Sequence, residues 1–198
     1  MRRTKAEAEQ TRNDILKAAL ILFDEQGYAQ TTLSTIARKA KVTRGAIYWH
    51  FENKEEILAA LAQAQFAELN SQINAAIAAP DTWQNLADNF IAYFRGLLKN
   101  PDCLRFCRIF NQHGRIPALG KLYRDYTALW QAQSREAVTR GKENGELHRD
   151  ADPEYLYFYL MMIFTGLVEL CLDQPDAPHL AQYCERVIRD TIALMQTL

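Results

Sequence analysis

The sequence has few of the residues that interrupt helices. Only 8 of its 198 residues are glycine and 6 are proline, and most of the prolines stand at borders between apolar segments. No stretch has the alternation of apolar and polar residues that is typical of a β-strand. The scarcity of helix breakers favours long helices, and a chain of this length can bury a real core in one large or two small domains.

The chemistry of cysteine and histidine is equally limited. The four cysteines, Cys103, Cys107, Cys171 and Cys184, form no CxxC pair and no zinc-finger spacing. Cys103 and Cys107 lie four residues apart among apolar neighbours, which is typical of buried, reduced thiols. Because the four histidines are scattered without ligand spacing, we expect neither a bound metal nor a cofactor.

Motifs of enzymes and of membrane insertion are missing as well. The sequence has no P-loop, no nucleophile elbow and no GxGxxG pattern, so we expect no enzymatic activity. The N-terminus is polar and shows no signal peptide. The longest strongly apolar run, 155–168, is too short to span a bilayer and ends at Glu169. These features predict a cytoplasmic protein.

The charges are unevenly distributed, although the net charge is only −1. Residues 1–54 carry ten Lys or Arg and six Asp or Glu, whereas residues 55–198 carry thirteen and eighteen. A mildly basic N-terminal part on an acidic body suits an N-terminal part that meets a polyanion. The polar arm at 1–9 is either disordered or lies along such a partner.

Apolar residues recur at helical spacing along most of the chain. The spacing predicts an all-α fold of about nine helices, among them segments 9–26, 44–50, 54–78, 119–142 and 153–172. The first three helices form an N-terminal head, the fourth connects, and five form the body.

Two of the helices in the head are short and are separated by a very short turn. Thr32 can cap the first of them and Thr43 the second, because a threonine oxygen accepts from the free N–H groups of a first helical turn. Residues 41–43 leave a turn of about three residues between the two helices. This arrangement predicts a helix-turn-helix.

The stretch 27–58 contains a set of motifs at characteristic spacing, including V-T-R-G at 42–45, I-Y-W-H-F at 47–51 and N-K-E at 53–55. Over roughly residues 10–60 the sequence resembles the TetR/AcrR family of bacterial transcriptional regulators. The Y-W-H-F form is similar to the multidrug-efflux repressors of that family. The resemblance implies a DNA-binding domain at 1–54 and a ligand-binding and dimerisation domain at 55–198.

Residue chemistry supports DNA contact by the second helix of this motif. Arg44 can reach phosphate or, bidentately, a guanine edge, and Ala46 can touch a thymine methyl group. Gly45 lets the backbone approach a phosphate at the positive end of the helix. The full set of predicted DNA-binding residues is Thr32, Thr43, Arg44, Gly45, Ala46, Tyr48, Trp49, His50 and Lys54.

The alternative is that 44–50 is only the third helix of a small bundle. Ile47 and Phe51 do fit a core. Burying Tyr48 and Trp49 as well would require cover on every side, and Arg44 argues against that. Trp49 remains open at this point, because it could contact the DNA backbone or brace the helix.

The body is rich in aromatic residues, nine of them between 83 and 130. Ordinary core packing explains most of them. Polar residues near or on these apolar faces, such as Gln133 and 111–113, need partners, and a small-molecule pocket is one way to supply them. The predicted ligand-binding residues are Phe66, Phe90, Phe94, Cys107, Phe110, Tyr126, Trp130 and Gln133. The resemblance implies a hydrophobic inducer here, in some members a cationic one.

The segment 153–172 is apolar around its whole circumference, so it must be covered on both sides. One side can face the body and the other a second subunit, as the family resemblance also implies. The predicted dimer-interface residues are Tyr155, Tyr159, Met162, Glu169, Val187 and Ile188. Glu169 has two interpretations, as an interface partner for an arginine or as a charge in the pocket.

These features together predict a homodimeric repressor that binds a palindromic operator and is released by a hydrophobic small molecule. A multidrug-efflux or detoxification operon is the target that the resemblance implies. Two alternatives stay open. One is a DNA-binding activator or architectural factor of the same fold without an inducer. The other is a helical small-molecule-binding protein without a DNA role.

Overall fold

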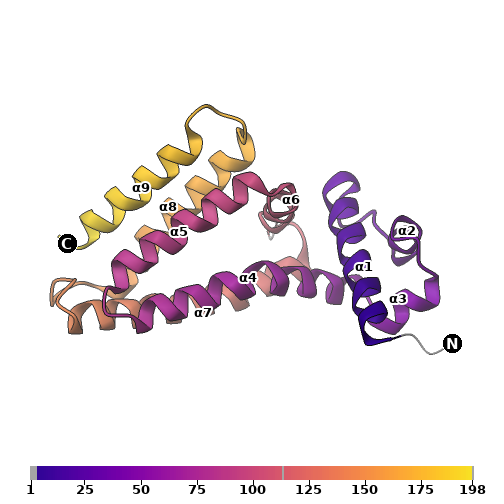
Figure 1. Ribbon diagram of the computed structural model, residues 1–198, viewed down its shortest axis with the longest axis horizontal. Coiled ribbons are helices and arrows are strands. Elements are labelled where there is room, and N and C mark those ends of the chain that lie inside the picture. The colour runs from indigo at the N-terminus through magenta and orange to yellow at the C-terminus, as the bar shows by residue number, and fades with distance from the viewer. Residues whose placement is uncertain (1–3, 113, 198) are drawn as a thin grey trace. The chain divides into compact units, whose positions relative to one another are not determined.

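The computed structural model describes residues 4–112 and 114–197, which form nine helices and no strand (Figure 1). The predicted all-α fold is therefore confirmed over this part of the chain. Residues 1–3 of the predicted arm and His113 lie outside the described residues. The chain divides into two compact units, one of residues 1–65 and 105–123, the other of residues 66–104 and 124–198.

The first unit is built on α1 (Lys5–Gln26), α2 (Leu33–Lys39) and α3 (Arg44–His50). Helix α1 begins four residues earlier than predicted, because Thr4 and Glu7 form a reciprocal capping box. Its buried face meets α2 and α3 around a core that includes Phe23, Ile36 and Ile47. Local capping thus extends the first helix into the polar arm.

The turn between α2 and α3 contains no glycine. Lys41 adopts a left-handed conformation with a φ of 57°. The N–H groups of Lys41 and Val42 donate to the carbonyls of Arg38 and Ala37 at 3.2 and 3.0 Å. Paired bonds of this kind close the end of a helix with a left-handed residue. Four residues, 40–43, separate the two helices, one more than predicted, and the helix-turn-helix itself is confirmed.

Helix α4 spans Lys54–Ala78, as predicted. The side chain of Asn53 accepts from the N–H of Glu56 at 2.9 Å, while the Glu56 carboxylate reaches back to the N–H of Glu52 at 2.8 Å. This resembles a capping box, except that the returning Glu56 carboxylate bonds the N–H of the residue before the cap instead of the N–H of the cap itself. The start of α4 belongs to the first unit and its end to the second.

The first unit also contains the second half of α6 (Pro101–Phe110) and the start of α7 (Pro117–Glu143). The guanidinium of Arg108 donates to both carboxylate oxygens of Asp24, at 2.8 and 2.7 Å. This pairing raises the pKa of Arg108, and Arg105 approaches the same carboxylate at 3.6 Å. Bidentate arginine–carboxylate geometry fixes orientation as well as distance, so α6 is held at the end of α1.

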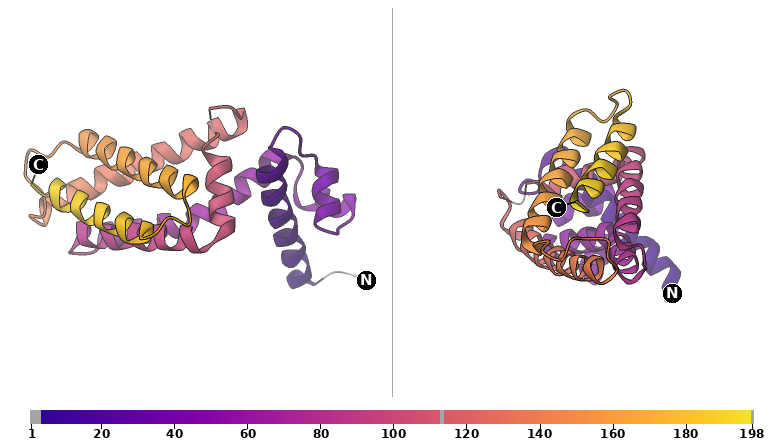
Figure 2. Two further views of the ribbon diagram at one scale, coloured as in Figure 1. Left: turned by 90° about the horizontal axis from the view of Figure 1, so that it is seen from above. Right: turned by 90° about the vertical axis from the view of Figure 1, so that its left-hand side faces the viewer.

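The second unit contains α5 (Thr82–Lys99), α8 (Pro153–Asp173), α9 (Leu180–Met195) and the larger part of α7. Helices α5, α8 and α9 pack side by side (Figure 2). Asp152 caps α8 and Pro153 takes its first position. Helices α5 and α9 each bury one apolar face, while α8 is apolar all round.

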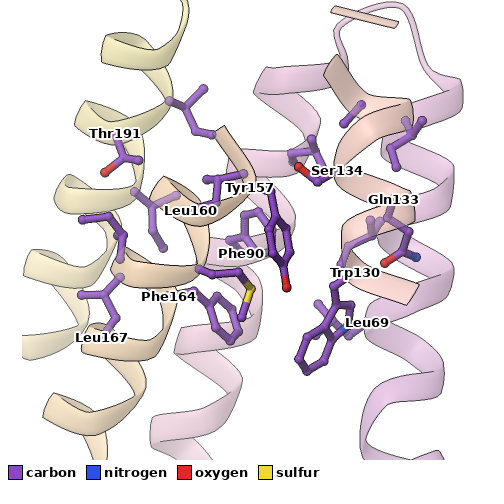
Figure 3. Close-up of a pocket in the computed structure, with 18 of the residues that line it drawn as sticks. Leu69, Phe90, Trp130, Gln133, Ser134, Tyr157, Leu160, Phe164, Leu167 and Thr191 are labelled. Carbon is purple, nitrogen blue, oxygen red and sulfur yellow. The ribbon is translucent and has the colours of Figure 1, made fainter. Parts of the chain in front are cut away.

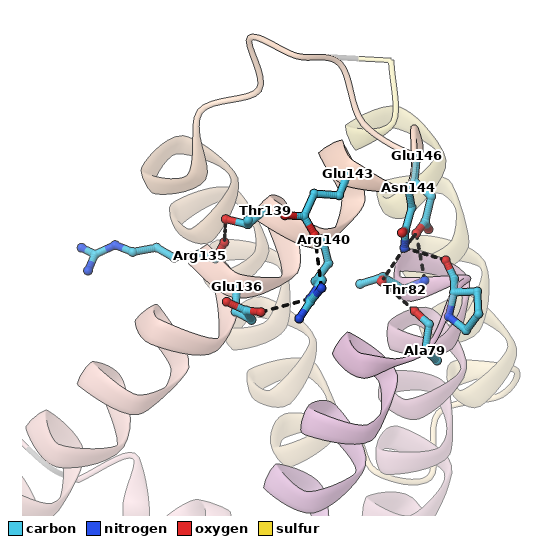
Figure 4. A network of polar contacts seen from close by, with 10 residues as sticks. Ala79, Thr82, Arg135, Glu136, Thr139, Arg140, Glu143, Asn144 and Glu146 are labelled. Atoms are coloured by element: carbon cyan, nitrogen blue, oxygen red, sulfur yellow. Dashed lines mark hydrogen bonds and ion pairs between the residues drawn. The ribbon is translucent and has the colours of Figure 1, made fainter.

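A distant glutamate caps α5. Asp81 makes no capping bond. Instead, Glu146 accepts from the N–H groups of Thr82 and Trp83 at 3.0 and 2.9 Å, and Asn144 donates to the carbonyl of Pro80 at 2.7 Å (Figure 4). A carboxylate at a helix N-terminus satisfies free N–H groups and faces the positive end of the helix. The turn after α7 therefore fixes the start of α5.

Within residues 4–112 and 114–197, α8 alone is long and apolar enough to cross a membrane by length and composition. Only 28% of its most apolar window is buried within the chain. Its exposed side chains include the large apolar residues Tyr155, Phe158, Met162 and Leu170.

Candidate DNA-binding surface and ligand cavity

Helix α3 presents two different faces. Ile47 and the following Phe51 are buried in the head, as predicted. Arg44, Gly45, Tyr48 and Trp49 are exposed, Tyr48 by 50% and Trp49 by 73%. Two large aromatic side chains at this level of exposure are unusual on a bundle helix that only packs. The interpretation of α3 as a purely structural helix fails on this face.

The exposed side chains of α3 are already arranged relative to one another. The Arg44 guanidinium lies over the Tyr48 ring, 6.0 Å from its centroid. Trp49 meets the edge of the His50 ring at 4.5 Å between centroids, and it does not brace the bundle, since most of its surface is open. A cation over an aromatic face restricts both side chains before any partner arrives.

The two threonines in the predicted set are helix caps. The Oγ1 of Thr32 accepts from the N–H of Thr35 at 3.1 Å, and that of Thr43 accepts from the N–H of Ala46 at 3.2 Å. Both residues are exposed. The Thr32 hydroxyl also donates to Thr35 Oγ1 at 3.3 Å. Both caps stand at helix N-termini, where an anionic oxygen is favoured.

Lys54 is partly committed to the head itself. Its Nζ donates to the Tyr28 carbonyl at 2.7 Å and lies 4.5 Å from the centroid of the Tyr28 ring. The Tyr28 hydroxyl donates to Glu55 at 2.9 Å. Burial, followed by this bond to Glu55, raises the pKa of Tyr28 well above its usual value. Lys54 thus anchors the start of α4, and a phosphate would share its ammonium group with the Tyr28 carbonyl.

The second unit contains a cavity among α4, α5, α7, α8 and α9 (Figure 3). The cavity has a volume of about 100 Å³, counted as the space open to the centre of a water-sized sphere. That is several times the space that one water needs, so the cavity can take a small organic molecule. The lining residues are Leu69, Ile73, Ile77, Leu86, Phe90, Phe94, Trp130, Gln133, Ser134, Ala137, Tyr157, Leu160, Met161, Ile163, Phe164, Leu167, Ile188, Thr191 and Ile192.

Four of the eight predicted ligand-binding residues line this cavity: Phe90, Phe94, Trp130 and Gln133. Phe66 and Tyr126 do not. Their rings contact each other in a tilted arrangement at 4.6 Å between centroids, and they contact Trp130 edge-on and tilted at 5.3 and 5.9 Å. These two rings therefore support the indole that lines the cavity instead of lining it themselves.

Cys107 and Phe110 are placed in the other compact unit, where both are buried. Phe110 stacks on Phe106 at 5.5 Å between centroids and lies 5.8 Å from Tyr123. Their aromatic and apolar character marks them as core of the first unit. For these two residues the ordinary core interpretation holds.

Helix α8 supplies lining residues that sequence reasoning assigned to no site, among them Tyr157, Leu160, Met161 and Phe164. The signal was present, since a helix that is apolar all round must turn one face inward. Which face it turns inward could not be read, because every face looks alike in sequence.

The predicted interface residues separate into two groups. Tyr155, Met162, Glu169 and Val187 are exposed, and Tyr159 is half-buried. Ile188 is buried within the chain and lines the cavity, so its side chain cannot reach a second subunit. Tyr155 and Tyr159 are four residues apart on one helix face, and their rings stack at 6.3 Å between centroids.

Among residues 4–112 and 114–197, no group of three His, Cys, Asp or Glu side chains is placed to hold a metal ion. The candidate functional features of the described residues are therefore helix α3 and the cavity. The first is the second helix of the helix-turn-helix, with exposed basic and aromatic side chains, and the second is an apolar chamber. Together they define an all-α helix-turn-helix protein with a separate small-molecule cavity.

Comparison with known proteins relates the N-terminal segment to a protein family. Residues 15–61 match the family described as "Bacterial regulatory proteins, tetR family". SrpR of Pseudomonas putida, an HTH-type transcriptional regulator, is 58% identical over 60 residues, covering 30% of this chain and 28% of SrpR. The HTH-type transcriptional repressor BepR of Brucella suis is 51% identical over 77 residues, covering 38% and 37%. The matched segments thus span well under half of these relatives.

A solved structure extends the likeness over the whole chain. The complex of SmeT with triclosan superposes with a TM-score of 0.85 at 25% sequence identity, covering 93% of this chain and 90% of SmeT. SmeT is described as the repressor of the Stenotrophomonas maltophilia multidrug efflux pump SmeDEF. Residues 15–61 thus match a family of regulatory proteins, as the motifs predicted, and most of the chain has the same fold as SmeT.

Proposed function

We propose that this protein is a ligand-responsive transcriptional repressor of a multidrug efflux or detoxification operon. The observation that carries the proposal is the pairing of an exposed recognition helix in the first unit with an apolar cavity in the second. Likeness to SmeT, a repressor of an efflux pump, supports the choice of operon. The protein acts in the cytoplasm, where its operator is found.

The DNA partner is a palindromic duplex bound by a homodimer. In helix-turn-helix dimers, the recognition helices enter the major groove at half-sites one or more turns apart. Arg44, Ala46 and Tyr48 read bases, while Thr32, Thr43 and the backbone at Gly45 hold phosphates. Phosphate contacts set the register of the protein, and base contacts set the sequence.

The two subunits meet through α8 and α9. Both helices expose apolar side chains, including Phe158, Met162, Tyr183 and Leu194. A contiguous apolar surface of this kind is stabilised by a partner. Paired α8 and α9 helices would form a four-helix interface and set the distance between the two recognition helices.

The inducer is a hydrophobic small molecule in the cavity, in keeping with the triclosan complex of SmeT. The expectation that some ligands are cationic is not carried forward, because none of the lining residues is acidic. A ligand that prefers the conformation with the wrong half-site spacing shifts the population away from DNA. Helix α4, which contributes to both compact units, transmits this preference.

The test begins with selection of bound duplexes from a random pool, followed by measurement of affinity against salt concentration. Wild-type protein should bind the selected palindrome with an affinity that falls steeply with salt. The double variant Arg44→Ala with Tyr48→Ala should lose at least about tenfold in affinity, since a bidentate base contact contributes about 1–3 kcal/mol. Unchanged affinity in this variant would sink the proposal.

A matched control removes the same charge elsewhere. Arg124→Ala takes away an exposed arginine on α7, in the second unit, and should leave DNA affinity within about twofold. Hydrophobic compounds are then added to the wild-type complex. Release of the duplex by a compound that binds the protein supports induction, whereas binding without release favours a regulator that has no inducer response.

A further inference from the structure

The cavity in the second unit has an unusually uniform chemistry. Of its nineteen lining residues none is Asp, Glu, Lys, Arg or His. Its polar atoms come from Gln133, Ser134 and Thr191, together with the Tyr157 hydroxyl and the Trp130 indole (Figure 3). The Trp130 N–H already donates to Asn70 at 3.3 Å. Any polar selectivity must therefore come from very few atoms.

The side-chain amide of Gln133 has one atom that is hydrogen-bonded and one that is not. Its Nε2 donates to the side-chain oxygen of Asn74 on α4 at 2.9 Å. Its Oε1 is buried and has no hydrogen-bond partner among the described residues. The side chain as a whole is only 7% exposed. Because Asn74 holds the amide nitrogen, the remaining oxygen is an unpaired acceptor beside the cavity, on the side away from α4 (Figure 3). Its surface is covered, so a ligand hydroxyl reaches it only when a neighbouring side chain moves aside.

Ser134 adds a second polar atom next to it in the sequence. Its Oγ is buried without a hydrogen-bond partner in the described part of the chain, and the residue is 9% exposed. Buried hydroxyls and amide oxygens normally have partners, and leaving one unpaired costs about 1–3 kcal/mol. Two adjacent residues with this deficit, both lining one apolar cavity, indicate that a ligand supplies what is missing.

We propose that the cavity selects an electrically neutral, mostly aromatic ligand that carries a hydroxyl group, and that this hydroxyl donates its proton to Gln133 Oε1. Ser134 Oγ provides a second hydrogen-bonding position for the same ligand. This inference rests on the proposed function, since it names the chemical class of the inducer for that cavity. The remaining ligand surface packs against Phe90, Phe164 and Trp130.

Charge excludes the cationic class. A quaternary ammonium group in this cavity would lose its hydration without gaining a carboxylate partner, and an isolated buried charge is strongly unfavourable. Aromatic faces alone offset only part of that loss. An ether of the same shape avoids the charge but has no proton to donate, so Gln133 Oε1 stays unpaired when it binds.

The experiment compares three probes that differ in one group: biphenyl-4-ol, 4-methoxybiphenyl and the biphenyl-4-yl-trimethylammonium cation. Binding to the full-length dimer without DNA is measured by titration calorimetry. Wild-type protein should bind biphenyl-4-ol about tenfold more tightly than the ether, which is the usual consequence of one satisfied buried hydrogen bond. The cation should bind at least about a hundredfold more weakly than the alcohol.

Three variants locate the effect. Gln133→Leu should reduce the preference for the alcohol over the ether to about twofold or less while the ether still binds. Gln133→Glu supplies a carboxylate to the cavity and should bring the cation into the measurable range. Gln84→Leu makes the same glutamine-to-leucine change at an exposed position on α5, so it should keep the wild-type preference.

The proposal is overturned if wild-type protein binds the cation as tightly as the alcohol, or binds none of the probes. Both results need only the wild-type chain, so they stand even if a variant does not fold. Persistence of the alcohol preference in Gln133→Leu would also overturn it. Operator binding and release are measured separately. Loss of probe selectivity with intact operator binding and release would refute this inference alone, and absence of operator binding would refute the proposed function.

Discussion

A side chain on Gly141 would collide with the indole of Trp83. A β-carbon built at Gly141 would lie closest to Trp83 Nε1 and 2.9 Å from Trp83 Cδ1, which is closer than real β-carbons approach other atoms, and 3.0 Å from Leu147 Cδ1. Trp83 is fully buried. The C-terminal turn of α7 therefore packs directly on the first turn of α5, the same region that Glu146 caps.

We expect Gly141→Ala to lower the free energy of unfolding by about 1–3 kcal/mol, because overpacking a rigid buried ring displaces it or the backbone. Chemical denaturation measures this difference. Gly96→Ala is the matched control, since a β-carbon there meets nothing within 4 Å, and it should be neutral or stabilising by up to about 1 kcal/mol. Equal stability of the two variants would contradict the packing described.

Substitution of Gly45 should affect stability and DNA affinity in opposite directions. A β-carbon there would meet only Thr43 Oγ1, at 4.0 Å, so Gly45→Ala should keep the fold and raise helix stability by about 0.5–1 kcal/mol. The added methyl group would stand between the backbone and a phosphate. Loss of one such charge-assisted bond should weaken DNA binding about tenfold, uniformly across operator sequences.

Thermal melts and operator titrations of the same Gly45→Ala preparation distinguish these effects. A variant that is more stable and binds DNA more weakly supports close backbone approach at α3. A variant that binds as well as wild type would show that Gly45 is not at the DNA surface.

The dimer surface can be tested on α8. Phe158 and Met162 are 65% and 64% exposed and stand four residues apart on one face. Burying a side chain of this size contributes about 1.5–3 kcal/mol, so Phe158→Glu with Met162→Glu should shift the protein to monomers at micromolar concentration. Sedimentation measures the mass, and helical circular dichroism checks the fold.

Gln84→Glu serves as control for the dimer test, because it adds charge at an exposed position on α5. It should remain dimeric. A double α8 variant that also remains dimeric would place the interface on another surface.

An ion pair between α5 and α9 predicts a specific response to acid. Glu185 accepts from Arg95 and from Arg189, the latter at 3.3 Å. The bond from Arg95, more than any other contribution, holds the pKa of Glu185 below its ordinary value of 4.5. For a depressed carboxyl pKa, the stabilisation is present above the unfolded-state pKa and is lost as pH falls through the folded-state pKa.

Wild-type protein should therefore melt at a higher temperature than Glu185→Gln above about pH 5, and the gap should close toward about pH 3. The difference should also shrink at high salt, because the pair is at the surface. Glu25→Gln, at an exposed position on α1, gives the baseline for losing a carboxylate. A gap that stays constant down to about pH 3 would contradict this account.

Sequence reasoning located the helix ends and the exposed second helix of the helix-turn-helix closely. Thr32 and Thr43 both cap the helices that they were predicted to cap. The start of α1 was predicted too late, although the Thr4–Glu7 pair is a readable capping box. These features depend on residues three or four positions apart, so their hydrogen bonds can be inferred without knowing the fold.

The cavity was predicted only in part, because its walls come from five helices. Phe90 and Gln133 were identified, but Cys107 and Phe110 belong to the core of the other unit. Ile188 was expected at the interface and lies inside. An aromatic residue on an apolar face looks the same in sequence whether it lines a cavity or fills a core.

By itself, then, the sequence determined the all-α fold, the helix-turn-helix and the exposed face of α3, since helical periodicity and capping are local properties. Only the tertiary structure decided which face of α8 turns inward, that Glu146 caps α5 across more than sixty residues, and that Gln133 presents an unpaired oxygen to an uncharged cavity. Those outcomes depend on how distant helices pack, because each helix fixes its own apolar faces but not the partner that covers them.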